Sequence, residues 1–140
     1  MSRHLRFLSW IGACVALTSS AYAHHSAAQF DSKAEFTTKA KVLEWHWANP
    51  HCLLKFVAKG EGNNPDREWV AETSNPTDMG RRGWIRNQLK LGDEITITIR
   101  PSRDGAATGQ VVRVVTADGK TLTAYGRSEG ASAPVPAPAP

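Results

Sequence analysis

The chain has 140 residues, with 17 Lys or Arg against 13 Asp or Glu, for a formal net charge of +4. This length allows one compact domain. The near balance of charge argues against a nucleic-acid-binding protein, and no stretch reaches the roughly 20 consecutive apolar residues that a stable membrane span needs.

The first residues, 1–23, have the pattern of a secretory signal peptide. A basic start precedes a short apolar run, and Ala21-Tyr22-Ala23 supplies the small residues that a signal peptidase reads. We therefore expect cleavage between Ala23 and His24, a periplasmic or secreted location in a bacterial cell, and a mature charge lower by two. A lipid-attachment site at Cys14 is the weaker alternative because it leaves a very short apolar core.

The first strand is expected to be long and bent. Residues 24–35 form a polar lead-in in which only Phe30 is suited to dock on the domain. From residue 37 onwards polar and apolar side chains alternate. The alternation through Ala40 and Val42 then continues one residue out of phase at Leu43, Trp45 and Trp47. Such a phase slip is typical of a β-bulge, which bends a strand and increases its twist.

The second strand is expected at about residues 51–58, after a turn at Asn49-Pro50. Its alternation places Cys52 on the same face as the aromatic residues of the first strand, and His51 on the other face. A Gly- and Asn-rich turn then leads to a third strand over residues 68–73.

A short helix is expected next, with Asn75 or Thr77 as the cap after a break at the Ser74-Asn75-Pro76 stretch. Two glycines weaken its first turn, so the helix is predicted only over about residues 83–89. Further strands are expected over residues 94–100, 109–116 and 121–125, the last two joined by an Asp-Gly hairpin turn.

Three strands, a short helix and then two or three strands indicate a mainly β protein. This order is that of a small barrel like the oligonucleotide/oligosaccharide-binding (OB) fold, over residues 36–126. An open antiparallel sheet with one packed helix is the alternative. Residues 127–140 are a tail rich in proline and alanine, which is expected to be disordered.

Several short motifs occur together in the expected mature chain. They are His24-His25-Ser26, Trp47-Ala48-Asn49-Pro50-His51, Ser74-Asn75-Pro76, Arg82-Gly83-Trp84 and Leu89-Lys90-Leu91-Gly92-Asp93-Glu94. As a set they resemble a family of small exported bacterial proteins known only as a domain of unknown function. The resemblance implies export and one small β-rich domain, and it implies no established activity.

The candidate chemistry lies in the histidines. Cleavage before His24 would give this residue a free α-amine beside its imidazole, and the two nitrogens can chelate one metal ion. His51 or His46 would supply a third nitrogen, with His25 as a competitor, in a set suited to copper(II) or another transition metal. The arrangement resembles the histidine brace of periplasmic copper-binding proteins and lytic polysaccharide monooxygenases, although only the first-residue histidine is shared.

Each histidine also has a purely structural interpretation. His24 and His25 can be polar residues tolerated at a flexible end, and His51 can simply bond a backbone carbonyl. The alternation places His46 opposite the tryptophans and therefore toward solvent.

Two further groups of residues have alternative roles. Four tryptophans in the domain can form its core or a platform for a flat ligand, and the core is the more frequent use. Cys52 has no partner once the leader is removed, so its thiol is either buried or reactive. The four tryptophans are Trp45, Trp47, Trp69 and Trp84.

The sequence contains no catalytic triad order, phosphate loop or dinucleotide motif. It therefore favours a non-enzymatic exported binding or accessory module, whose small ligand or protein partner is unknown. A copper-dependent redox enzyme of the brace type and a purely structural or interaction domain are the alternatives.

Overall fold

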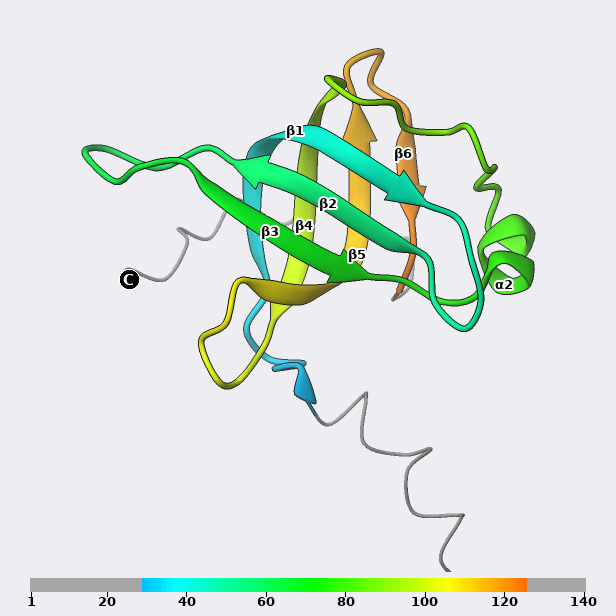
Figure 1. Cartoon of the computed structure of the whole chain (residues 1–140), viewed down its shortest axis with the longest axis horizontal. Coiled ribbons are helices and arrows are strands. Elements are labelled where there is room, and N and C mark those ends of the chain that lie inside the picture. The colour runs from blue at the N-terminus through cyan, green and yellow to red at the C-terminus, as the bar shows by residue number, and fades with distance from the viewer. Residues whose placement is uncertain (1–28, 126–140) are drawn as a thin grey trace, which may run out of the picture.

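The computed structural model describes residues 29–125. The predicted signal peptide, His24, His25 and the Pro/Ala tail lie outside the described residues. Within them are six strands and one short helix, α2 (Figure 1). In chain order these are β1 (Phe36–His46), β2 (Leu53–Ala58), β3 (Arg67–Glu72), α2 (Pro76–Arg81), β4 (Glu94–Pro101), β5 (Thr108–Thr116) and β6 (Thr121–Thr123).

The strands form a closed barrel. The hydrogen-bonded order is β3-β2-β1-β4-β5-β6, and an additional parallel pairing of β3 with β5 joins five of these strands into a ring. The short β6 extends the sheet beside β5. Closure pairs part of the outer edge of β3, which an open sheet would expose. The prediction of a small OB-like barrel is confirmed, and the open-sheet alternative is wrong.

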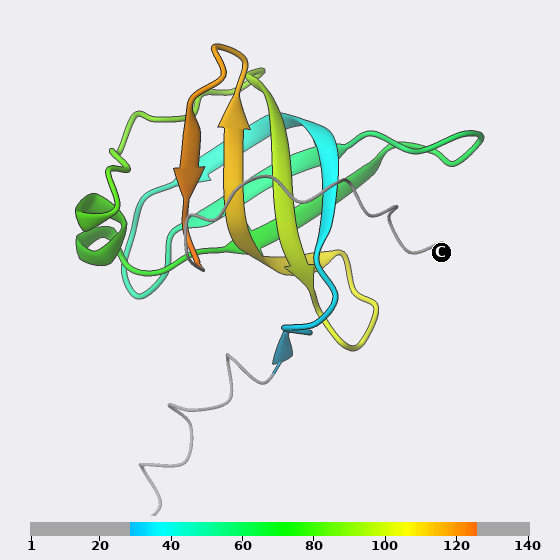
Figure 2. The same ribbon diagram turned by 180° about the vertical axis from the view of Figure 1, so that it is seen from behind.

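The long first strand serves two walls of this barrel. Its first half pairs with β4 and its second half with β2, and the register shifts between Val42 and Glu44. The shift is the bulge predicted from the sequence, and Leu43 is the inserted residue. Figure 2 shows β1 curving over the barrel to reach both neighbours. The bulge therefore allows one strand to close the barrel without a break.

The core comes from the inward face of each strand. On β4 all three isoleucines are buried, and Trp69 packs edge-on against Phe36 with the ring centroids 5.2 Å apart. Trp84 is also buried, whereas Trp45 and Trp47 are only partly buried and pack against the core from the end of β1. Trp69 and Trp84 are thus core residues, as the core interpretation predicted. Trp45 and Trp47 only border the core.

The helix begins earlier than predicted. Asn75 is its N-cap, as expected: its side-chain oxygen accepts a hydrogen bond from the Asp78 backbone N–H. The helix ends because Gly83 has φ +84°, a left-handed conformation that favours glycine. Its N–H donates to Gly80 O, and the next N–H, from Trp84, donates to Met79 O, both at 3.0 Å. This is a Schellman C-cap.

The prediction of a helix over residues 83–89 is therefore wrong. These residues form turns, and Ile85 is exposed while Leu89 is buried, so the two do not share one helical face. After the turns, Gly92 N–H donates to Val42 O at 2.8 Å and returns the chain to the barrel.

The lead-in residue Phe30 docks on the barrel, as its apolar character predicted. It is buried and forms an isolated bridge with Ser102, after the end of β4. No helix within residues 29–125 is long and apolar enough to cross a membrane.

Candidate functional site

The turn between β1 and β2 brings the predicted site residue His51 beside the start of α2. The Asn49–Pro50 peptide in this turn is cis. Immediately after it, Cys52 N–H donates to Ser74 O and Thr73 N–H donates to Cys52 O, at 3.1 and 2.9 Å. These bonds continue the β2–β3 pairing past Leu53, so the backbone around His51 is held in place.

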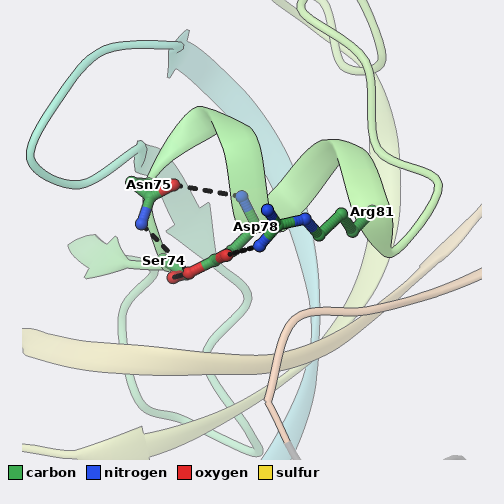
Figure 3. A network of polar contacts seen from close by, with 4 residues as sticks. All are labelled: Ser74, Asn75, Asp78 and Arg81. Atoms are coloured by element: carbon green, nitrogen blue, oxygen red, sulfur yellow. Dashed lines mark hydrogen bonds and ion pairs between the residues drawn. The ribbon is translucent and has the colours of Figure 1, made fainter.

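A small polar network fixes the other side of this turn (Figure 3). The Asp78 carboxylate accepts hydrogen bonds from the Ser74 hydroxyl, the Asn75 amide and the Arg81 guanidinium, each at 3.0 Å. Because Ser74 also accepts the backbone bond from Cys52, the helix cap and the strand pairing support each other.

The His51 imidazole is oriented by one hydrogen bond. Its Nδ1 lies 3.0 Å from the carbonyl oxygen of Thr73. Since a carbonyl oxygen can only accept, Nδ1 must carry the hydrogen, and the Nε2 of the neutral ring keeps its lone pair. Metal-binding histidines commonly donate their second ring nitrogen to a carbonyl or carboxylate in this way. The structural interpretation of His51 is therefore observed, and the hydrogen bond leaves the lone pair of Nε2 unused by Thr73.

His51 shares the outer face of the sheet with His46 and Glu72. Leu53 pairs with His46 on β1 and with Glu72 on β3, so these three side chains form one row. His51 precedes Leu53 by two residues and shares its face. Burial raises the pKa of the Glu72 carboxyl, and a positive charge on His51 opposes this rise. Glu72 is therefore a carboxylate beside His51 rather than an isolated surface group.

Within residues 29–125, no three His, Cys, Asp or Glu side chains lie close enough to hold a metal ion by themselves. His46 is exposed, as the alternation predicted, with Nδ1 4.0 Å from the Glu44 carboxylate. His24 and His25 lie outside the described residues.

Cys52 is fully buried on the opposite face from His51. Burial raises the pKa of its thiol above the usual value, against smaller opposing effects from the Ala48 backbone and the Thr73 hydroxyl. The sequence left this cysteine either buried or reactive, and the structure shows it buried. Its thiol therefore does not reach the outer face that carries His51.

Sequence reasoning missed Tyr125, which follows β6. Burial, and next the negative charge of Glu72, raise the pKa of its phenol, while a hydrogen bond with Ser74 opposes the rise. Tyr125 therefore lies close enough to Glu72 and Ser74 to be affected by them. No local signal identifies it, because Glu72 and Ser74 precede it by about fifty residues and the barrel closure brings them together.

A separate cavity of about 720 Å³ is lined by residues of β1, β2, β4 and β5. Its lining includes Lys39, Lys41 and Lys59 together with the carboxylates Asp66 and Glu94. The mixed charge gives no preference for one ligand class, and the cavity lies toward the opposite end of β1 from His46.

The fold and this surface define a small OB-like barrel with one oriented histidine at the β1–β2 turn. The chain belongs to the family of unknown function DUF6152, whose model matches residues 13–112. This confirms the resemblance to a domain of unknown function, and the matched residues include His24 and His51. No curated protein and no solved structure matches the chain.

Proposed function

We propose that this protein is an exported, non-enzymatic binding or accessory module of the periplasm that holds a transition metal, with copper(II) as the preferred ion. The metal would be bound by the α-amine and imidazole of His24 and by Nε2 of His51. The observation that carries the proposal is the hydrogen bond from His51 Nδ1–H to Thr73 O, which leaves Nε2 with a free lone pair.

Export supplies the first half of this site. Cleavage after Ala21-Tyr22-Ala23 creates the amine of His24, and that amine exists only if the leader is removed at this position. The reference pKa values are near 8 for an α-amine and about 6.5 for imidazole. Both groups therefore lose their protons to a metal near neutral pH at little cost.

The chain must also be long enough to join the two halves. The described residues begin at Gln29, whose carbonyl accepts from Arg103 N–H at 3.0 Å. Residues 24–28 can extend at most about 18 Å from that point. The proposed site can form only if His24, at most this far from Gln29, reaches a metal ion bound by His51. A structure of the copper-loaded mature protein can check this condition.

The nitrogen donors explain the choice of metal. Two imidazoles and an amine form a set that favours copper(II) in a tetragonal geometry, whereas magnesium and calcium prefer oxygen ligands. Glu72 and solvent are available for weaker positions. Because Cys52 is buried on the other face, no thiolate competes for the ion.

The test compares copper(II) titrations of residues 24–140 with an authentic His24 terminus and of the same chain carrying one extra N-terminal glycine. We expect the extension to weaken binding at least about tenfold, because it removes the amine that chelates together with the His24 imidazole. His51→Gln should weaken binding similarly and change the electron paramagnetic resonance spectrum. His46→Gln is the matched control and should leave both unchanged.

Equal and weak binding by all four proteins would contradict the proposal. A second measurement separates a metal carrier from a redox enzyme of the brace type. Tight copper binding without substrate turnover in the presence of ascorbate and oxygen or peroxide supports the carrier, whereas turnover supports the enzyme.

A further inference from the structure

The segment between α2 and β4 carries a local excess of positive charge. Four basic residues occur within residues 81–90, whereas residues 79–92 contain no Asp or Glu. Arg81 is paired with Asp78. The other three are exposed, and none has a carboxylate within 4.0 Å among the described residues. These three are Arg82, Arg86 and Lys90. We call residues 81–91 the basic segment.

The same segment exposes the two most accessible large apolar side chains of the described residues. Ile85 is 60% exposed and Leu91 is 78% exposed, whereas the next, Leu53 on β2, is 37% exposed. A folded surface tolerates single apolar residues. Here, however, the two most exposed apolar side chains lie among three cations that have no carboxylate partner within residues 29–125. This combination of side chains needs an explanation.

Two anchors hold the basic segment against the barrel. At one end Trp84 is buried, and its Nε1–H donates to Thr123 O at 3.0 Å. At the other end Leu89 is buried and Gly92 N–H bonds Val42 O. Figures 1 and 2 both show this stretch running along the outer edge of the molecule from α2 to β4. Ile85 and Leu91 are therefore exposed on a segment that is attached to the barrel at both ends.

Aromatic side chains border the segment. The ring of Trp45 lies 5.4 Å from that of Trp84 and 5.7 Å from that of Trp47. Its indole nitrogen is 3.5 Å from Ile85 O. Trp45 and Trp47 are only partly buried, so two amphipathic rings lie at the margin of the cationic and aliphatic surface.

We propose that the basic segment docks this protein on the surface of an anionic phospholipid bilayer. Arg82, Arg86 and Lys90 would lie among the lipid phosphates, and the two exposed aliphatic side chains would enter the headgroup boundary. Cations interleaved with aliphatic side chains, with tryptophan at the margin, suit such an interface. A protein partner would instead favour a continuous apolar centre with charges at its rim. This docking is independent of the proposed metal site.

The test is co-sedimentation of residues 24–140 with vesicles of phosphatidylcholine alone or with about one third phosphatidylglycerol. We expect binding to the anionic vesicles only, weakened by salt, with a blue shift of tryptophan fluorescence. The double variant Arg82→Gln/Arg86→Gln should lower the partition coefficient about tenfold or more, given the attraction of each cation to an anionic surface. Ile85→Ser/Leu91→Ser should lower it comparably while leaving the charge intact.

Two control variants test whether the effect belongs to this segment. Lys39→Gln/Lys41→Gln removes the same charge from the cavity face, and Leu53→Ser removes an exposed apolar side chain from β2. Both should bind anionic vesicles like the parent. Circular dichroism and thermal melting establish that every variant is folded.

Three results would overturn the proposal: equal binding to neutral and anionic vesicles, equal losses in the segment variants and the lysine control, or unchanged binding by Ile85→Ser/Leu91→Ser. Soluble polyglutamate that binds as tightly as the anionic vesicles would also overturn it, because the partner would then be any acidic polymer.

Discussion

His51 and Cys52 are neighbours in the chain with opposite environments. The strand pairing directs Cys52 into the core and His51 to the outer face, where the Thr73 carbonyl fixes its ring. One backbone arrangement therefore separates a structural thiol from a nitrogen that can bind a ligand.

The burial of Cys52 leads to a prediction about its reactivity. With residues 24–140, in which it is the only cysteine, a disulfide reagent at neutral pH should label the folded protein at least about 100-fold more slowly than the unfolded protein, because labelling requires opening of the core. The raised pKa of the thiol acts in the same direction, since the thiolate is the nucleophile. Labelling followed by absorbance with and without urea makes the measurement, and rapid labelling without urea would contradict it.

The faces of these residues could be predicted, but their partners could not. Alternation along the second strand identified Cys52 as inward and His51 as outward, and alternation along the first identified His46 as outward. The hydrogen bond of His51 with Thr73 and the electrostatic effect of Glu72 on Tyr125 join segments far apart in sequence, and no local pattern specifies them.

At the scale of the elements, two glycines three residues apart have opposite roles in α2. Gly80 lies within the helix, is exposed, and has nothing within 4 Å of the position of an added Cβ. Gly83 also has open space, but its φ of +84° is one that L side chains rarely adopt. The sequence prediction treated both as weak helix residues and began the helix at Gly83. The cap explains the error, because Gly83 ends the helix instead of starting it.

This difference predicts opposite effects of one substitution. Gly80→Ala should raise the free energy of unfolding by about 0.5–1 kcal/mol, since alanine is the better helix former. Gly83→Ala should lower it by about 1–2 kcal/mol, since the left-handed conformation becomes strained. Urea denaturation followed by circular dichroism measures both. Equal signs for the two variants would show that the cap does not determine where the helix ends.

At the scale of the whole molecule, the parallel pairing of β3 with β5 is what turns the sheet into a barrel. The order of elements was enough to predict an OB-like fold, and the phase slip at Val42 was enough to predict the bent first strand. The closing pair itself joins Ala71 to Gly109, and its register depends on packing across the barrel. The sequence therefore indicated the architecture but not the junction that completes it.

Gly109 makes this junction tight. It pairs with Ala71 on one side and with Pro101 on the other. A Cβ at this position would lie 2.9 Å from Arg100 O and 3.1 Å from Ile99 Cδ1. The first of these atoms belongs to the backbone of β4 and cannot move without disturbing the β4–β5 pairing.

We therefore expect Gly109→Ala to lower the free energy of unfolding by about 1–3 kcal/mol, the usual cost of overpacking. The Val70 amide, which donates to Ala107 O at 3.1 Å beside the junction, should exchange its hydrogen faster. Gln110→Ala is the matched control: it changes the next, partly exposed residue of β5 and should alter stability by no more than about 0.5 kcal/mol. Urea denaturation and amide exchange give the two measurements. If both variants unfold like the parent, the contact at Gly109 does not limit closure, and the barrel must be held mainly by its core.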